Sequence, residues 1–341
     1  MKLSIYGTHR VIAEKVLPQA AKKLDNTPIC YDNELLIEVD VLNIDSASFH
    51  QIKTQANNDE LKMQEIIKNI ITSQGKMQNP VTKSGGMLIG EVKEIGKDYI
   101  TDLKIGDKIA TLVSLSLTPL YLEDIISINI TNEQVKIKGQ AILFQSGIYE
   151  KIPNDLDEKL VLAALDVCGA PAQTKKLAKK DNTVLIIGAA GKSGILCAYE
   201  AKKQVGINGK VIGLVNEKEQ VTLLKELGLC DEIILEDALD SITVYEKVSA
   251  LTNGNLADLV INAVNVENTE MTSILATKDL GTVYFFSMAT SFTKAALGAE
   301  GVKKDVNMMI GNGYTKDHAK TTLDILRESK KIKDYFIQRY V

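Results

Sequence analysis

The sequence predicts a two-domain α/β protein, with a β-rich domain over residues 1–150 and a doubly wound parallel sheet over residues 151–314. Three observations support this prediction. The 341 residues suffice for two domains that each bury a core. The first part of the chain consists of short β-branched runs separated by turns, and in the second part helices and strands alternate. Residues 315–341 are expected to return to the first domain.

The first domain is predicted from six strand-like segments, which read LLIEVDVLNI, MLIGEVKEIG, KIATLVS, DIISINI, QVKIKG and AILFQSG. Between the first two lies residues 57–76, NNDELKMQEIIKNIITSQGK, whose apolar residues recur at helical spacing. This segment predicts an inserted amphipathic helix, which we interpret as scaffold.

The second domain is predicted from the alternation of helical and strand-like segments. Helices are expected at LDEKLVLAALDVCGAPAQTKKLAKK, KSGILCAYEAKKQV and EKEQVTLLKELG, and strands at TVLIIG, KVIGLV, DEIIL, ADLVINAV and GTVYFF. Such alternation implies right-handed crossovers in a parallel sheet. The tail HAKTTLDILRESKKIKDYF is expected to be a helix followed by an extended stretch.

Composition narrows the function class. The net charge of −4 comes without blocks of like charge, so the chain offers no basic face for nucleic acid and no polybasic membrane anchor. No apolar run approaches the roughly 20 residues that span a bilayer, and the first residues do not resemble a signal peptide, so we expect a cytoplasmic protein. The four cysteines form no CxxC pair, which indicates reduced thiols rather than a zinc ribbon. A small-molecule partner is favoured.

The strongest motif is TVLIIGAAGKSG, which places Gly188, Gly191 and Gly194 directly between a buried strand and a helix. Such a turn lets the backbone approach a pyrophosphate, whose charge then meets the helix N-terminus, as in Rossmann domains. The predicted cofactor-binding set also includes Ala190, Lys192 and Ser193. As an alternative to phosphate binding, the three glycines could serve only to let the turn pack closely. The position of the turn between a strand and a helix argues against this alternative. The Walker spacing GxxxxGK[ST] is absent, which disfavours a nucleotide hydrolase.

The residue that contacts the adenine ribose is expected at the end of the second strand of this domain, at Val215 or Asn216. An NAD site usually carries an acid there, whereas an NADP site supplies cations. No acid stands at this tip, although Glu217 follows at once. Lys218 is the nearest cation, with an ordinary surface lysine as the alternative. We therefore predict NAD or NADP as cofactor, with Asn216 and Lys218 as candidate contacts.

Several segments resemble the medium-chain dehydrogenase/reductase superfamily. They are VDVLNIDSASF, GEVKEIG followed by DLKIGDKIA, LAALDVCGAPAQT, and the quinone-reductase form of the glycine turn, TVLIIGAAGKSG. The resemblance covers most of the chain. It implies a GroES-like catalytic domain followed by a Rossmann domain, a substrate cleft between them, and a homodimer formed through the dinucleotide domains.

The zinc ligands of that superfamily are missing from the matching positions. Asp45 or Ser46 stands where zinc members place a cysteine, and Gly86-Met87 stands where they place a His-Glu pair. Three histidines and four cysteines spaced this far apart supply no recognisable ligand set. We therefore predict an enzyme without a catalytic metal.

A closer resemblance is carried by YGTHRV, LDNT, YDNELLIEVDVLNIDSASFHQI and GKMQNPVTKSGGMLIGEV. These strings are similar to the family of L-erythro-3,5-diaminohexanoate dehydrogenases of lysine fermentation. That resemblance implies an oxidative deamination, in which the diamino acid, water and NAD(P)⁺ give 5-amino-3-oxohexanoate, ammonium and NAD(P)H.

In the superfamily's architecture the residues after the early strand face the nicotinamide, which makes Asp45, Ser46 and His50 the candidate catalytic residues. Asp45 is suited to hold an ammonium or relay its proton, Ser46 to pass protons, and His50 to act as a general base. IDSAS fits a helix N-cap equally well, and His50 fits a surface or packed histidine better than a catalytic one.

Candidate substrate-binding residues come from three places. His9 and Arg10 lie in the YGTHRV start, and Arg10 is one of three arginines in the chain, a residue type suited to bind a carboxylate. A structural ion pair explains Arg10 equally well. Lys83 and Ser84 lie in the NPVTKSGG loop, where a glycine pair allows close backbone approach. Glu123 is a weaker candidate.

Two other functions fit the same motifs. A zinc-free NADPH-dependent quinone or enoyl reductase shares the glycine turn and would have an apolar cleft. A non-catalytic nucleotide-sensing protein would keep the fold without the chemistry. Turnover of an amino acid separates both from the deaminating dehydrogenase.

Overall fold

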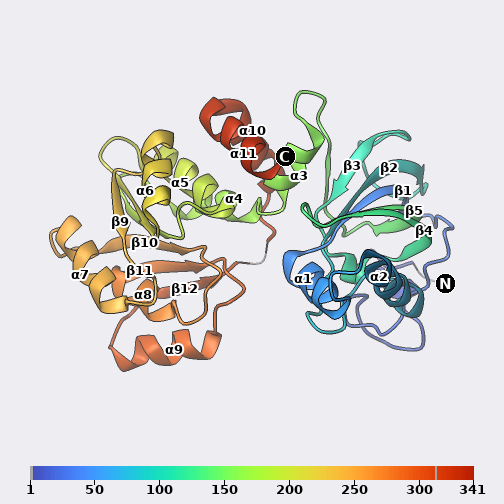
Figure 1. Cartoon of the computed structure of the whole chain (residues 1–341), viewed down its shortest axis with the longest axis horizontal. Coiled ribbons are helices and arrows are strands. Elements are labelled where there is room, and N and C mark those ends of the chain that lie inside the picture. Colours follow the sequence, from blue (N-terminus) through green and yellow to red (C-terminus); the bar gives the residue numbers. More distant parts are fainter. Residues whose placement is uncertain (1–2, 312) are drawn as a thin grey trace. The chain divides into compact units, whose positions relative to one another are not determined.

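The computed structural model describes residues 3–311 and 313–341. The chain divides into two compact units, Met1–Glu158 (unit 1) and Lys159–Val341 (unit 2), each with its own sheet (Figure 1). The division falls after Glu158 rather than after residue 150, because β6 and the start of α3 still belong to unit 1.

Unit 1 is built on a six-stranded antiparallel sheet of order β4-β5-β1-β2-β3-β6. Its strands are β1 Glu34–Asn43, β2 Met87–Ile95, β3 Lys108–Thr111, β4 Leu120–Asn129, β5 Gln134–Phe144 and β6 Tyr149–Lys151. The predicted segments QVKIKG and AILFQSG form the single strand β5, whose buried face includes Val135, Ile137 and Ala141.

Two helices cover this sheet, α1 Ser46–Gln55 and α2 Glu60–Gln74, and two short 3-10 turns, η1 Thr8–Arg10 and η2 Leu115–Leu117, lie in its loops. The inserted helix predicted from the sequence is α2. It buries Met63, Ile67, Ile70 and Ile71 on one face and packs against β4. Helix α1 begins at the IDSAS segment, where the Asp45 side chain accepts the N–H of Ser48 at 2.9 Å.

Unit 2 is built on a parallel sheet of order β12-β11-β10-β7-β8-β9. Its strands are β7 Thr183–Ile187, β8 Lys210–Val215, β9 Glu232–Leu235, β10 Ala257–Asn262, β11 Thr277–Phe285 and β12 Asn307–Ile310. The chain moves outward from β7 through β8 to β9 and then returns to the other side of β7 with β10. This reversal between β7 and β10 is the topological switch point of the sheet.

The helices of unit 2 are α3 Glu158–Leu165, α4 Gly169–Leu177, α5 Lys192–Val205, α6 Lys218–Leu227, α7 Ser241–Leu251, α8 Glu270–Ala276, α9 Phe292–Gly301, α10 His318–Glu328 and α11 Lys330–Tyr340. Figure 1 shows α4, α5 and α6 on one face of the sheet and α7, α8 and α9 on the other. The doubly wound fold predicted from the sequence is therefore confirmed.

Two predicted elements of this part of the chain differ in detail. The helix expected over residues 156–180 is broken into α3 and α4, because Pro171 lacks the N–H that a continuous helix needs and sits instead in the first turn of α4. The end of the tail, expected to be extended, is helix α11, which Ser329 caps and which buries Ile332 and Phe336 one turn apart.

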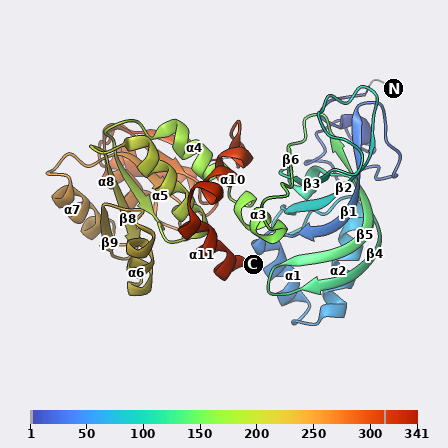
Figure 2. The ribbon, with the colours of Figure 1, turned by 90° about the horizontal axis from the view of Figure 1, so that it is seen from above.

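The C-terminal helices pack within unit 2. Helix α10 contacts α4 and α5, and α11 contacts α10, as Figure 2 shows from above. The expectation that residues 315–341 return to the β-rich domain differs from this arrangement, because the apolar face of α10, with Leu323 and Leu326, is buried against helices of unit 2. No helix among the described residues combines the length and apolar character needed to cross a membrane.

Candidate functional site

The glycine turn joins β7 to α5 as predicted. Gly188 has a φ of +81°, a conformation that favours glycine, and the N–H groups of Gly188 and Ala189 both donate to the Leu214 carbonyl of β8. Gly191 occupies the N-cap of α5, with no side chain to cap it. The turn therefore directs the free N–H groups of the first turn of α5 toward the carboxyl ends of the strands, where they can meet a phosphate.

The glycines of this turn have different roles. A Cβ on Gly194 would lie 2.1 Å from the Gly188 carbonyl oxygen, so this glycine allows the helix to pack on the turn. A Cβ on Gly191 would meet only that same oxygen, at 3.4 Å, which is ordinary contact. Gly191 is thus not required by the packing of the protein itself, and its absent side chain leaves room in the cavity that the turn borders.

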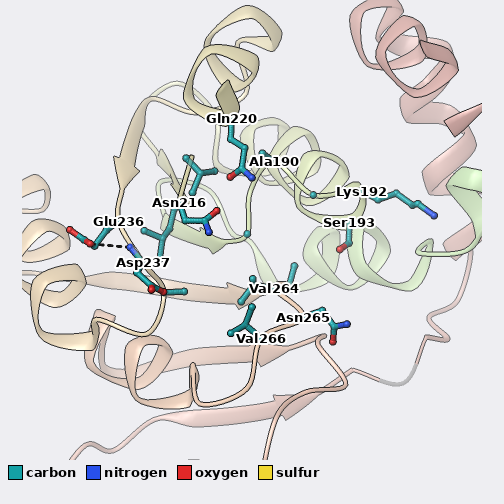
Figure 3. Close-up of a pocket in the computed structure, with 16 residues that line it drawn as sticks. Ala190, Lys192, Ser193, Asn216, Gln220, Glu236, Asp237, Val264, Asn265 and Val266 are labelled. Atoms are coloured by element: carbon teal, nitrogen blue, oxygen red, sulfur yellow. Dashed lines mark hydrogen bonds between the residues drawn. The ribbon is translucent and has the colours of Figure 1, made fainter. Parts of the chain in front are cut away.

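This cavity, of about 320 Å³, lies at the carboxyl ends of β7, β8, β9 and β10 and is the candidate cofactor site (Figure 3). Its lining residues are Gly188, Ala190, Gly191, Lys192, Ser193, Leu214, Val215, Asn216, Gln220, Glu236, Asp237, Ala238, Ala263, Val264, Asn265 and Val266. A ligand of an open parallel sheet binds in such a place, outside the strand ends at the switch point. The residues present therefore fit a dinucleotide.

Only some of the predicted cofactor residues line this cavity. Ser193 and Asn216 line it, whereas Lys218 is exposed and outside the lining set. Figure 3 shows the Lys192 side chain directed away from Asn216 and Gln220. Its ammonium lies 2.9 Å from an Asp166 carboxylate oxygen and 5.2 Å from the centre of the Tyr340 ring.

Sequence reasoning missed the lining residues that follow β9 and β10. These are Glu236, Asp237 and Ala238 after β9, and residues 263–266 after β10. The rule that ligands bind at the carboxyl ends of parallel strands was the available signal, because both strands had been predicted.

Glu236 is charged at neutral pH. Its carboxylate lies 2.8 Å from the Lys247 ammonium and also accepts the N–H of Asp237. The hydrogen bond from Lys247, followed by that from Asp237, lowers the pKa of Glu236 below its ordinary value. The next residue, Asp237, accepts the N–H of Leu239 at 2.9 Å.

In unit 1 the candidate Asp45 uses only one carboxylate oxygen. Oδ1 accepts the N–H of Ser48, so the N-cap interpretation of the sequence is confirmed, while Oδ2 is buried without a hydrogen-bond donor among the described residues. A buried carboxylate oxygen is costly unless something donates to it. Helix capping therefore accounts for Oδ1 of Asp45 but gives no reason for the burial of Oδ2.

The structure brings the Lys83-Ser84 loop close to Asp45. The Ser48 hydroxyl, in the first turn of α1, lies 2.6 Å from that of Thr82, and the buried Asn79 amide donates to the Ser48 carbonyl. Lys83 adopts a left-handed φ of +60° and its side chain is exposed. Two candidate groups that are distant in sequence thus lie around the start of one helix.

Arg10 and His9 belong to a buried network instead. The Arg10 guanidinium donates to both Glu34 carboxylate oxygens, at 2.9 and 2.6 Å, and to the carbonyls of Asp25, Thr27 and Ile29. His9 contacts the same carboxylate at 2.7 Å. Because Arg10 is fully buried and all its donors have acceptors, the structural ion pair is the interpretation that these contacts favour over a substrate carboxylate.

The remaining candidates are on the surface of unit 1. Ser46 donates to a Glu133 carboxylate oxygen at 2.5 Å, and His50 is exposed on α1. Glu123 is exposed on β4 and paired with Lys138 at 2.7 Å.

Two full-length relatives decide the family. A protein of Acetoanaerobium sticklandii named L-erythro-3,5-diaminohexanoate dehydrogenase is 59% identical over 345 residues, which cover 100% of both chains. A protein of the same name from Fusobacterium nucleatum subsp. nucleatum is 55% identical over 339 residues, covering 98% of each. This chain belongs to the L-erythro-3,5-diaminohexanoate dehydrogenase family. The family resemblance stated from the sequence is therefore confirmed.

Family models match both halves of the chain. Residues 9–153 match the L-erythro-3,5-diaminohexanoate dehydrogenase N-terminal domain, and residues 194–328 match a domain described as zinc-binding dehydrogenase. A solved structure of the mycobacterial protein Rv1454c complexed with NADPH has the same fold, with a TM-score of 0.55 at 16% identity, over 97% of this chain and 88% of that one. The chain is thus a dehydrogenase of the medium-chain superfamily.

The second family model is described as zinc-binding, but the described residues contain no group of side chains that could bind zinc. Within residues 3–311 and 313–341, no three His, Cys, Asp or Glu side chains lie close enough together to hold a metal ion. At the superfamily's ligand positions this family member carries Asp45, which caps a helix, and Gly86, whose φ of +98° and contact with the Asn43 carbonyl leave no room for a side chain.

Proposed function

We propose that this chain catalyses the oxidative deamination of L-erythro-3,5-diaminohexanoate. The observation that carries the proposal is the identity of 59% and 55%, along essentially the full chain, to two relatives that bear this enzyme's name. The substrate, water and NAD(P)⁺ give 5-amino-3-oxohexanoate, ammonium and NAD(P)H. The quinone or enoyl reductase and the nucleotide sensor considered from the sequence have no such relatives in their favour.

In this proposal, residues of unit 2 bind the cofactor and residues of unit 1 bind the substrate. The nicotinamide cofactor, when bound, accepts the hydride. The N–H groups at the start of α5 hold its phosphates, Gly191 leaves space for them, and Ser193 adds a hydroxyl. The carboxyl ends of β8 and β9, with Asn216 and Asp237, contact its adenosine half.

For the substrate we propose Asp45 as the charged contact. The diamino acid brings two amino groups, and the buried Oδ2 of Asp45 is an acceptor without a donor among the described residues. An ammonium supplies such a donor, and the same carboxylate can take up its proton before the C–H bond is oxidised, since the reacting amine must be neutral. Lys83 and Ser84, close to the same helix end, are proposed to contact the substrate carboxylate, and Ser46 and His50 are secondary candidates for proton transfer.

We also propose that the enzyme works without zinc, in the cytoplasm and as a homodimer. Support for the dimer comes from β12, an edge strand of the parallel sheet with Met308, Met309 and Ile310 exposed. An exposed apolar edge strand is a ready partner for the same strand of a second copy. Light scattering should give twice the mass of the chain, and elemental analysis should find far less than one zinc per chain.

The experiment that tests the function is cofactor reduction, followed at 340 nm, with purified protein, the diamino acid and either NAD⁺ or NADP⁺. Ammonium and the 5-amino-3-oxo acid should appear in equal amounts with the reduced cofactor. L-Lysine and a simple quinone serve as alternative substrates. Reduction of the quinone by NADPH, with no reaction of the diamino acid, would replace the proposal with the reductase.

A further inference from the structure

Unit 2 has a second cavity, of about 350 Å³, which shares no lining residue with the cofactor cavity. Its lining comes from helix α4, from strands β11 and β12, and from residues that follow β12. The glycine turn and the candidate substrate contacts of unit 1 have no part in it. The second cavity is therefore separate from the residues to which the deamination is assigned.

The most deeply buried side chain of this lining is Tyr284 of β11, which is 1% exposed. Its hydroxyl forms no hydrogen bond with any of the described residues. The hydroxyl end of the ring lies at Gly311, because a Cβ added there would come within 2.9 Å of both Cε2 and Oη of Tyr284. Gly311 itself lines the cavity. Since a buried hydroxyl without a partner is costly, the cavity is the place where a partner for Tyr284 would lie.

Gly311 keeps the hydroxyl of Tyr284 accessible. The φ of Gly311 lies outside the left-handed region, so its backbone conformation does not demand glycine, whereas the space in front of the tyrosine does. Burial raises the pKa of Tyr284 above its ordinary value, and the group therefore keeps its proton at neutral pH. It faces the cavity as a hydrogen-bond donor.

The charges around this donor are positive. Lys176 of α4 and Lys316 both line the cavity, and neither forms an ion pair in the part of the chain that the structure describes. No Asp or Glu is among the described lining residues. The amide of Gln173 accepts the Thr315 hydroxyl at 3.0 Å, while its nitrogen lies 3.2 Å from the Met309 sulfur, a weak acceptor. The polar part of the lining thus offers donors and cations.

The rest of the lining is apolar. Met309 and Ile310 of β12 and the ring of Tyr314 border the same cavity. A bare inorganic anion would leave these side chains without a contact, whereas an anion with a short hydrocarbon chain would cover them.

We propose that this cavity binds a small organic anion of the class of short-chain carboxylates. Its carboxylate accepts the Tyr284 hydroxyl and lies near the ammonium groups of Lys176 and Lys316, and its chain lies against Met309 and Ile310. The diamino acid does not suit this cavity, because it would bring two ammonium groups to a lining with two lysines and no acid. The proposal concerns a ligand other than the substrate and does not depend on the deamination.

The test is calorimetric titration of the full chain, in its native assembly, with butyrate, inorganic phosphate and butylamine. Wild type should bind butyrate with a Kd of about 1 mM or below and should not bind butylamine measurably. Tyr284→Phe keeps the ring and removes the hydroxyl, and should weaken butyrate binding by about tenfold or more, since a hydrogen bond to a charged group is lost. Joint replacement of Lys176 and Lys316 by glutamine should weaken it by at least about tenfold.

Matched controls use the same changes outside the cavity. Tyr245→Phe alters an exposed tyrosine of α7, and Lys175→Gln alters an exposed lysine of α4 that is not among the lining residues. Both should bind butyrate as wild type does. The unfolding midpoint and NADH titration of Tyr284→Phe should also match wild type, because the change removes only an unpartnered hydroxyl and leaves the cofactor cavity intact.

Three results would overturn the proposal. If butyrate does not bind, or binds Tyr284→Phe and the double lysine variant as tightly as wild type, only water fills the cavity or the ligand lies elsewhere. If phosphate binds more tightly than butyrate, the apolar lining does not select a carboxylate. If butylamine binds as tightly as butyrate, the lysines do not set the charge of the ligand. Failure of the proposed function would appear separately, as an absence of turnover of the diamino acid.

Discussion

The two units use polar groups in different ways. In unit 1, Arg10, Glu34 and Lys76 are fully buried and hold loops in place through side-chain hydrogen bonds to carboxylates or carbonyls. In unit 2 the candidate cofactor site is formed largely by main chain, through Gly188, Gly191 and the first turn of α5. Substitutions in unit 1 therefore risk the fold together with function, whereas those in unit 2 can remove a ligand and spare the fold.

This difference also sets how a candidate residue must be tested. A charged side chain of unit 1 is informative only beside a control that performs the same structural task elsewhere in that unit. A glycine of unit 2 is informative beside a glycine that has equal space but no ligand.

The largest effect is expected from Asp45→Asn, which keeps the size and capping ability of the side chain while removing its charge. If Asp45 binds the substrate ammonium or takes its proton, the turnover rate should fall by about 10²–10⁴-fold with little change in cofactor affinity. Steady-state rates with the diamino acid across pH, and titration with NADH, measure the two quantities.

Asp59→Asn is the matched control, because Asp59 caps α2 in the same way and accepts the N–H of Lys62. It should leave the rate unchanged. Near-normal turnover of Asp45→Asn would reduce Asp45 to a helix cap and move attention to His50 and the Lys83-Ser84 loop.

Of the substitutions proposed, Glu34→Gln should lower the free energy of unfolding the most. Burial raises the pKa of Glu34, but hydrogen bonds from His9, Arg10 and the Tyr31 N–H outweigh it and leave the pKa lowered, so the group is charged in the folded protein. Glutamine removes the buried counter-charge of Arg10 and leaves only the partly exposed Asp25 carboxylate, 3.6 Å away, at a cost of about 3–5 kcal/mol of unfolding free energy. Urea unfolding measures this, with the exposed Glu94→Gln as control. A loss within 1 kcal/mol of that control would show that the network is not needed for the fold.

Gly191→Val should show the opposite behaviour in unit 2. A Cβ there meets only the Gly188 carbonyl oxygen, at 3.4 Å, so the fold should persist, while the larger side chain fills space that the phosphates need. NADH affinity should fall by at least about 100-fold, with little change in the unfolding midpoint. Gly301→Val, at a helix end with open space around it, is the control. NADH affinity within a few-fold of wild type would mean that the phosphates lie elsewhere.

The sequence was most informative where a backbone requirement demands one residue type. The glycine turn, the order of strands and helices around it and helix α2 follow from Gly188, Gly191, Gly194 and regular apolar spacing. It was least informative where one side chain fits two uses. Arg10 suits a substrate carboxylate and Glu34 equally well, and only the fold brings Glu34, 24 residues away in sequence, onto its guanidinium. Glu236 and Asp237 carry no motif of their own and were missed, although they directly follow the predicted strand DEIIL, whose carboxyl end is where a ligand binds.

The smallest predicted effect concerns Lys76, whose buried ammonium donates to the carbonyls of Pro18 and Gln19 at 2.7 and 3.1 Å. Burial lowers its pKa from 10.5 to about 8, although the Glu14 carboxylate opposes this. Because the folded-state pKa lies below the unfolded one, the unfolded chain binds more protons between pH 8 and 10.5, and this residue's contribution to stability rises with pH over that range.

From pH 7 to 9 the gain should be about 1 kcal/mol of unfolding free energy relative to Lys76→Met, which cannot titrate. The readout is the difference between the two proteins at each pH, because thiols and other groups that titrate in both then cancel. Lys76→Met also loses the two hydrogen bonds, which shifts its stability equally at every pH and leaves the slope unaffected. The exposed Lys15→Met should run parallel to wild type. A difference between wild type and Lys76→Met that stays flat from pH 7 to 9 would mean that the ammonium remains charged throughout, held by its carbonyls as firmly as Arg10 is held by Glu34.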